Sequence, residues 1–114
     1  MQMHAYRRLI YILDLMEDAM RDQCLWSSIP PSVVAMASNM PFCCDAMPLV
    51  QWLQWVLLPR LRAIVEVRGP LPVRSGIAPY AEVVWPNTPP YPALLAILRD
   101  LDTVLGGGGE PKGA

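Results

Sequence analysis

Residues 46–67 read AMPLVQWLQWVLLPRLRAIVEV, and this stretch carries the broadest apolar surface in the chain. Its large apolar residues recur at helical spacing on several sides of the predicted helix: Trp52, Leu53, Val56, Leu57, Leu61 and Ile64. The polar residues form one narrower stripe: Gln51, Gln54, Arg62 and Glu66. A helix that is apolar on most sides is usually surrounded by other elements, so we expect the fold to pack around this one.

Polar and proline residues mark the start and the middle of this helix. Asp45 is placed to cap its N-terminus, because a carboxylate there can accept a bond from a free backbone N–H. Pro48 falls in the first turn, but it disfavours a helical Met47 and can delay the start by a residue or two. Pro59 lies in the interior, where it leaves the Trp55 carbonyl without its helical donor and predicts a kink.

Three further helices are predicted, over about residues 3–25, 79–85 and 92–105. The first and last show clear apolar faces: Tyr6, Leu9, Leu13, Met16 and Met20 in one, Leu94, Leu98, Leu101 and Leu105 in the other. Glu17 and Arg21 are spaced to pair across one turn. Pro79 and Pro92 suit the first turns of their helices, and Gly106 suits a left-handed C-terminal cap.

The connections between these helices are rich in proline. Residues 27–44 are predicted to form a long loop with a helical turn near residues 33–37, and Gly69–Pro72 and three prolines (Pro86, Pro89, Pro90) mark two more breaks. No region alternates apolar and polar residues long enough to indicate a sheet. The predicted fold is therefore all-α, a four-helix bundle with one short helix and long Pro-rich loops. We expect residues 1–105 to form a single domain and residues 106–114 to form a flexible Gly-rich tail.

Composition and charge exclude several classes of function. The chain has 114 residues, 54% of them hydrophobic and 17% charged, with a formal net charge of -1. Such a chain has no overall field to attract nucleic acid, so we expect no autonomous DNA binding and leave RNA association open. Polar residues and Pro59 interrupt the apolar stretch Leu49–Val67, which predicts no membrane span. We see no signal peptide and no spaced disulfide framework, so we expect a cytoplasmic protein.

The sequence contains no recognisable catalytic or metal-binding motif. His4 is the single histidine and lies near the N-terminus, so it is a poor general base for a cysteine nucleophile. Cys24, Cys43 and Cys44 lack the paired spacing of metal ligands, and we expect these thiols to be buried or half-buried and to fill space. We therefore predict no metal, no cofactor and no enzymatic activity.

Six residues are candidates for a partner or ligand surface: Asp45, Trp52, Trp55, Arg60, Tyr80 and Trp85. The tryptophans can be core anchors or can line an interface, where tryptophan is enriched. Arg60 can contact an anion beside the kink, or it can bond a carbonyl freed by Pro59 or pair with Asp45 or Glu82. Tyr80 and Trp85 belong to a short segment, residues 77–85, with a single charge, so some of its apolar side chains should stay exposed. We expect an association surface there with a tryptophan as anchor, the alternative being that Trp85 closes the end of the core.

Several blocks of sequence resemble the YqcC-like family of small bacterial proteins. They are Pro41-Phe42-Cys43-Cys44-Asp45, Trp52-Leu53-Gln54-Trp55-Val56, Pro59-Arg60-Leu61, Pro70-Leu71-Pro72 and Ala78-Pro79-Tyr80. The resemblance covers roughly residues 6–105 and implies an all-helical bundle. The family's genes often lie beside one for a tRNA pseudouridine synthase, which implies a link to RNA modification. The resemblance supplies no catalytic residue that could be assigned in this sequence. The adjacent cysteines and the Gly-rich tail depart from the family pattern.

Three functions remain after these exclusions. The first is a non-enzymatic interaction or adaptor domain whose apolar surface is covered in a homodimer or by another protein. The second is a binder of a small apolar ligand, held between the second helix and the loops at Pro41 and Pro79. The third is an accessory to tRNA pseudouridine modification, which depends on the gene context that the resemblance implies.

Overall fold

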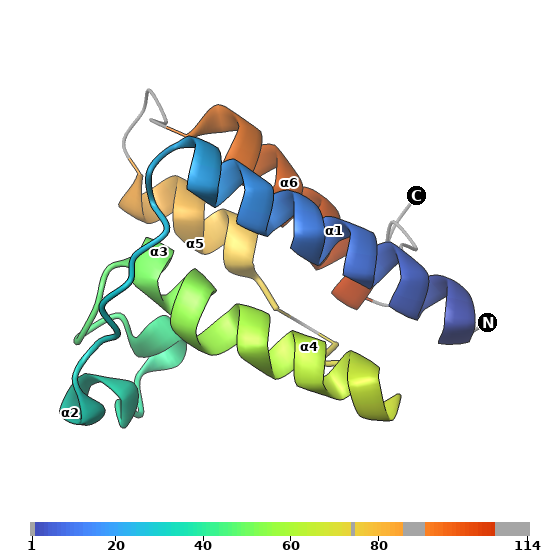
Figure 1. Cartoon of the computed structure of the whole chain (residues 1–114), viewed down its shortest axis with the longest axis horizontal. Helices are drawn as coiled ribbons and strands as arrows, with labels where there is room; N and C mark the ends of the chain where they lie inside the picture. Colours follow the sequence, from blue (N-terminus) through green and yellow to red (C-terminus); the bar gives the residue numbers. More distant parts are fainter. Residues whose placement is uncertain (1, 74, 86–90, 107–114) are drawn as a thin grey trace.

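The computed structural model describes residues 2–73, 75–85 and 91–106, and all regular structure within them is helical. The predicted all-α class is therefore confirmed for these residues. In chain order the elements are α1 (Gln2–Asp22), α2 (Val33–Met36), the 3-10 turn η1 (Pro41–Cys43), α3 (Leu49–Trp52), the π turn η2 (Leu53–Leu57), α4 (Leu58–Val67), α5 (Ile77–Val84) and α6 (Pro92–Leu105). Because α3, η2 and α4 follow without a break, they form one long helix (Figure 1).

The most extensive contact between helices joins α1 and α6, which run side by side in Figure 1. α5 packs on α6, and α4 packs on α1. The long helix therefore lies at one side of the packed helices, and the prediction that the fold packs around it was wrong. The long helix is not surrounded because one of its sides is exposed. That side includes Glu66 of the predicted polar stripe and four residues outside the stripe: Pro59, Arg60, Ala63 and Val67.

The predicted apolar faces of the first and last helices are confirmed. Every residue named for the α1 face is buried, from Tyr6 to Met20, and so is every leucine named for the α6 face. The Tyr6 hydroxyl also donates to the Gly69 carbonyl at 2.6 Å. This bond joins the start of α1 to the end of α4, so the two helices run antiparallel (Figure 1).

A carboxylate from another helix caps the N-terminus of α5. The residue before α5 is Gly76, with a left-handed φ of 61°, and glycine has no side chain to accept the first backbone donors. Asp102 of α6 accepts them, with Oδ1 3.0 Å from Ile77 N and Oδ2 2.7 Å from Ala78 N. This cap lets α5 begin at Ile77, two residues before the predicted start at Pro79.

Two predicted helix ends and one predicted cap conformation differ from the structure. α1 ends at Asp22, not near Leu25, because Cys24 takes a left-handed φ of 60° and Leu25 N bonds back to Met20 O at 2.8 Å. The long helix begins at Leu49 after an extended Pro48, so Asp45 is not its cap. Gly106 has φ -84°, not a left-handed value, although a Cβ there would lie 2.8 Å from the Asp102 carbonyl oxygen.

The helical turn predicted near residues 33–37 is confirmed as α2, which Ser32 caps through a bond from Ala35 N to its hydroxyl. The predictions for Pro86, Pro89, Pro90 and residues 107–114 lie outside the described residues. Within the described residues, no helix has both the length and the apolar character of a membrane span.

Candidate interaction site

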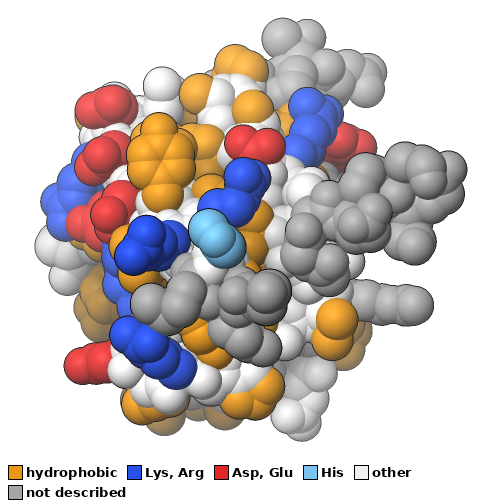
Figure 2. Space-filling view, turned by 90° about the vertical axis from the view of Figure 1, so that its right-hand side faces the viewer, with side chains coloured by type: hydrophobic (Ala, Val, Ile, Leu, Met, Phe, Trp, Pro, Cys, Tyr) orange, Lys and Arg blue, Asp and Glu red, His pale blue; other side chains and the backbone are white. Residues whose placement is uncertain are grey.

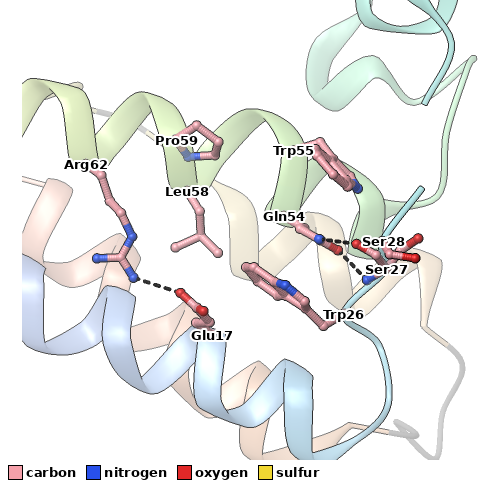
Figure 3. A pocket seen from close by; sticks show the side chains of 9 residues that line it. All are labelled: Glu17, Trp26, Ser27, Ser28, Gln54, Trp55, Leu58, Pro59 and Arg62. Carbon is pink, nitrogen blue, oxygen red and sulfur yellow. Dashed lines mark hydrogen bonds and ion pairs between the residues drawn. The ribbon is translucent and has the colours of Figure 1, made fainter. Parts of the chain in front are cut away.

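A groove of about 530 Å³ lies between the end of α1, the loop that follows it and the long helix (Figure 3). Trp26, Trp55, Leu58 and Pro59 supply its apolar walls, and the other lining residues are Glu17, Ser27, Ser28, Gln54 and Arg62. The predicted ligand site was elsewhere, between the second helix and the loops at Pro41 and Pro79. The groove shares Trp55 with the predicted site residues, and it adds Trp26 and the start of the 27–44 loop, which were not predicted to line a site.

The π turn η2 places Gln54 and Trp55 on the wall of this groove. Pro59 has no backbone N–H, and its ring would collide with the carbonyl four residues earlier in a regular α-helix. The helix widens to a π turn just before the proline, and Leu58 N donates to the Leu53 carbonyl five residues earlier. Leu57 and Leu58 keep right-handed helical angles. The proline that predicts a kink is thus accommodated by a π turn, a feature that recurs at functional sites.

Gln54 joins the loop after α1 to the long helix. Its Oε1 accepts from Ser27 N at 2.8 Å, and its Nε2 donates to Ser27 O at 2.7 Å. The side chain is buried, with 6% of the residue exposed, so it does not belong to the predicted solvent-facing stripe. The Ser27 hydroxyl donates to Ile29 O and accepts from Ile29 N, both at 3.1 Å. These polar groups of the loop are therefore hydrogen-bonded within the loop itself.

Ion pairs at the α1–α4 contact neutralise the charged end of the groove. Arg62 contacts Asp14 and Glu17, each at 3.2 Å, and Arg21 contacts Glu17 at 2.9 Å, which confirms the predicted Glu17–Arg21 pair. The Arg21 guanidinium also lies over the Trp26 ring, 4.6 Å from its centroid. Because these charges satisfy one another, the groove favours an uncharged occupant.

One polar atom of the site lacks a partner. Trp55 Nε1 is buried and has no hydrogen-bond acceptor among the described residues, although the residue as a whole is only half-buried. An unpaired buried donor costs about 1–3 kcal/mol relative to a paired one. Figure 3 shows the nitrogen-bearing edge of the ring on the side where Ser27 and Ser28 lie. Trp55 therefore lines the groove with its ring, while its N–H lies buried with no acceptor among the described residues.

Two of the predicted site residues, Trp52 and Tyr80, meet through Phe42. The Phe42 ring stacks on Tyr80 with centroids 4.5 Å apart, and it meets Trp52 edge-on at 5.0 Å. Phe42 takes a left-handed φ of 59°, which is strained for a residue with a side chain. Partial burial, and to a lesser extent the neighbouring Cys44 thiol, raise the pKa of Tyr80 above its ordinary value. These rings fill the space at Pro41 and Pro79 where a ligand was predicted.

The remaining predicted site residues do not form a surface with these two. Trp85 is 8% exposed and meets Tyr91 edge-on at 5.2 Å, so it closes the end of the core. Trp85 and Trp52 are both buried, which favours the alternative that Trp85 closes the end of the core. The exposed residues of segment 77–85 are Pro79, Glu82, Val83 and Val84, and Tyr80 is half-buried.

Asp45 and Arg60 also lie outside the groove. The Asp45 carboxylate accepts from the Ser38 hydroxyl at 2.5 Å and closes a turn of the loop. Arg60 is exposed and has no ion pair with any described residue, since Glu82, one predicted partner, pairs with Arg99 at 2.8 Å. Both side chains are exposed, and neither lines the groove.

Several exposed apolar residues lie in a segment that was not predicted to carry a site. Residues 23–44 contain no Asp, Glu, Lys, Arg or His, and this run is the signal that could have found it. We name its exposed large hydrophobic residues the α2 surface: Ile29, Val33, Val34, Met36 and Met40. Val33 and Val34 are 86% and 83% exposed, values that a core-forming segment would not show. Trp26, Ser27 and Ser28 of the same run line the groove, so the α2 surface begins where the groove ends.

The cysteines and the charged faces add no second site. Cys43 is buried, whereas Cys24 and Cys44 are exposed, which corrects the expectation that all three thiols are at least half-buried. Among the described residues, no three of His, Cys, Asp and Glu are grouped to hold a metal ion. On the face that Figure 2 shows, basic side chains lie near His4 and acidic ones lie among and beside them, so charges of both signs are mixed.

The chain is similar to known proteins in both sequence and structure. Protein YqcC of Escherichia coli is 34% identical over 103 residues, which are 90% of this chain and 94% of that protein. A family model described as tRNA pseudouridine synthase C matches residues 8–104. The chain belongs to the YqcC-like family. The solution NMR structure of Escherichia coli YqcC, from that family, matches with a TM-score of 0.80 and 31% identity, over 96% of this chain and 95% of that one.

Two other relatives match this chain over very different shares of their own lengths. A protein of Haemophilus influenzae is 39% identical over 70 residues, which are 61% of this chain and 66% of that protein. The tRNA pseudouridine synthase C of Pectobacterium carotovorum is 41% identical over 56 residues, which are 49% of this chain but 15% of the synthase. A segment similar to half of this YqcC-like chain thus lies inside a much longer polypeptide.

Proposed function

We propose that the chain is a non-catalytic helical bundle that binds a tRNA pseudouridine synthase of the C type and acts with it on tRNA in the cytoplasm. One observation carries the proposal, namely the 41% identical segment within the Pectobacterium synthase. Two folded units in one polypeptide meet at an effective concentration near the millimolar range, which is useful when they act together. A separate chain needs a binding surface of its own for the same association.

The α2 surface suits such an association. It is apolar, it is exposed, and it lies in a run without Asp, Glu, Lys, Arg or His. Protein interfaces are depleted of charged residues at their centres. In Figure 1, α2 lies at the lower left, away from the α1–α6 pair. A partner can therefore cover these side chains without rearranging the core, and the chain's net charge of -1 favours a protein partner over direct binding to tRNA.

Binding to the synthase of the same organism tests the proposal. We expect the wild-type chain to bind it in isothermal titration calorimetry, and the double variant Val33→Asp/Val34→Asp to lose at least tenfold in affinity, because two charges would be desolvated. Val67→Asp is the matched control, since Val67 is 75% exposed at the far end of α4. All variants should unfold within about 0.5 kcal/mol of the wild type. No binding by the wild-type chain would refute the proposal.

A second candidate function is favoured by the size and lining of the groove. A volume of about 530 Å³ with mainly apolar walls falls within the range of small-molecule sites. The groove would then hold a small apolar ligand without any synthase. Native mass spectrometry of the chain, purified from its own organism, would detect such a ligand, and a mass of two chains would instead indicate a homodimer that covers the α2 surface.

A further inference from the structure

The segment between α1 and the long helix carries the α2 surface but is weakly held by the rest of the molecule. None of the residues 23–42 is buried, although a few are half-buried. We name residues 28–44 the strap, and their hydrogen bonds to described residues all stay between residues 27 and 47. A segment with so few buried contacts opens locally at a lower free energy than the helices unfold.

The two ends of the strap are held in different ways. At the first end, Ser27 bonds to the long helix through two part-buried hydrogen bonds, at 2.8 and 2.7 Å. At the second end, the Phe42 ring lies against Tyr80 and Trp52, and Cys43 is the first buried residue after the end of α1. The second end is therefore attached to the helices by apolar and ring contacts alone.

Backbone strain opposes closure at this second end. Phe42 and Cys43 both have left-handed φ values, 59° and 49°, which are unfavourable for residues with a side chain. Such angles persist only where the surrounding contacts impose them. Once the Phe42 ring and the Cys43 thiol leave their places, both residues can return to ordinary backbone angles. The strained end is thus the one that can release while the Ser27 end stays attached.

We propose that the strap is a conformational switch for the α2 surface. It releases from the Phe42 end as one unit while the helices stay folded, and only the closed strap presents the α2 surface. A helix as short as α2 (Val33–Met36) is not stable without support, so its exposed valines lose their fixed arrangement when the strap opens. The effect on synthase binding rests on the proposed function, whereas the opening itself does not.

The Cys43 thiol reports the opening, because it is buried while Cys24 and Cys44 are exposed. In the variant Cys24→Ser/Cys44→Ser, an aromatic disulfide reagent should label Cys43 at least about tenfold faster than global unfolding alone would allow. The rate should change little at low urea, because local opening exposes little surface. A rate that follows global unfolding at every urea concentration refutes the strap. If this variant does not fold, the third and slowest label of the wild-type chain gives the same rate.

Two matched tyrosine variants separate local from global opening. Tyr80→Leu removes the ring that stacks on Phe42, so labelling of Cys43 in the absence of urea should accelerate about threefold or more. Tyr91→Leu removes another half-buried ring, which contacts Trp85, and should leave this rate within about twofold of the parent. Equal acceleration by the two variants would show that labelling requires global unfolding, and would refute the strap.

The strain at Phe42 predicts an unusual order for two further variants. Phe42→Ala and Phe42→Gly both remove the ring, but glycine adopts a left-handed φ without steric cost. The closed strap should therefore be more populated in the glycine variant, and Cys43 should be labelled about threefold more slowly there than in the alanine variant. Slower labelling in the alanine variant would mean that strain does not oppose closure.

The synthase connects the switch to the proposed function. A partner that binds only the closed strap, present at about 100 times its dissociation constant, should slow labelling of Cys43 about 100-fold. If the complex forms and the labelling rate is unchanged, the switch is refuted and the proposed function stands. If no complex forms, the proposed function and the role of the switch in it are refuted, while labelling of the free chain still decides whether the strap opens.

Discussion

The side-chain carboxamide of Gln54 forms two hydrogen bonds with the backbone of Ser27. Ser27 N donates to Gln54 Oε1 at 2.8 Å, and Gln54 Nε2 donates to Ser27 O at 2.7 Å. The contact joins residues 27 positions apart and is part-buried. It holds the loop after α1 against the π turn and thereby fixes one wall of the groove. The pair satisfies four hydrogen-bonding groups at once, which makes it a strong test of the structure.

Replacing Gln54 with leucine should destabilise the fold. Leucine has a similar size but cannot bond, so the Ser27 N–H and carbonyl would remain partly buried and unpaired. We expect a loss of about 1–3 kcal/mol in the free energy of unfolding. Urea titration monitored by circular dichroism measures it, with Gln51→Leu as the control, because Gln51 is half-buried and has no comparable bond to a described residue. Equal midpoints for the two variants would contradict the pairing.

Asp102 should stabilise α5 although it belongs to α6. Removing its carboxylate in Asp102→Ala leaves the Ile77 and Ala78 amides without acceptors, and we expect a cost of about 1–3 kcal/mol. Asp100→Ala, an exposed neighbour on the same helix, should cost less than about 0.5 kcal/mol. Amide hydrogen exchange provides a local readout. Exchange at Ile77 and Ala78 should accelerate in the first variant alone, and equal protection in both variants would argue against the cap.

Truncations along the long helix should differ with burial. Leu53 is fully buried, so Leu53→Ala should cost about 2–4 kcal/mol through lost contacts and a cavity. Val56 is half-buried, and Val56→Ala should cost less, about 1 kcal/mol or below. Thermal melts compare the two directly. Similar losses would mean that the helix is rotated from the orientation described above.

Tyr80 should ionise at a higher pH than an exposed tyrosine. Burial, with a smaller effect of Cys44, raises its pKa in the folded chain above the ordinary value near 10. A raised folded pKa means that the associated stability is fully present below the unfolded pKa and is lost as the pH rises through the folded pKa. The free energy of unfolding should thus decline above about pH 10. Tyr80→Phe keeps the ring on Phe42 and should remove this part of the decline, while Tyr11→Phe, at a 66% exposed site, should not.

Local patterns in the sequence determined the helical elements. The spacing of Leu9, Leu13 and Met16 identified the buried face of α1, and the leucines from Leu94 to Leu105 identified that of α6, with both ends of that helix. Such faces can be read from sequence because side chains three and four residues apart share one side of any α-helix. The uncharged run 23–44 was equally available, although its meaning depended on knowing that Val33 and Val34 are exposed.

The tertiary structure alone decided which helices form the main contact and where the site lies. Gln54 has the polarity of a surface residue, and its burial depends on Ser27, a partner that helical spacing cannot indicate. Asp102 bonds the first amides of a helix that begins 25 residues earlier in the chain, and the Trp85 ring meets that of Tyr91, the residue before α6. Whether a polar side chain is buried, or a large apolar one exposed, depends on which distant groups reach it. These contacts arise from the packing of whole helices, whereas sequence periodicity reports only the side of one helix on which a residue lies.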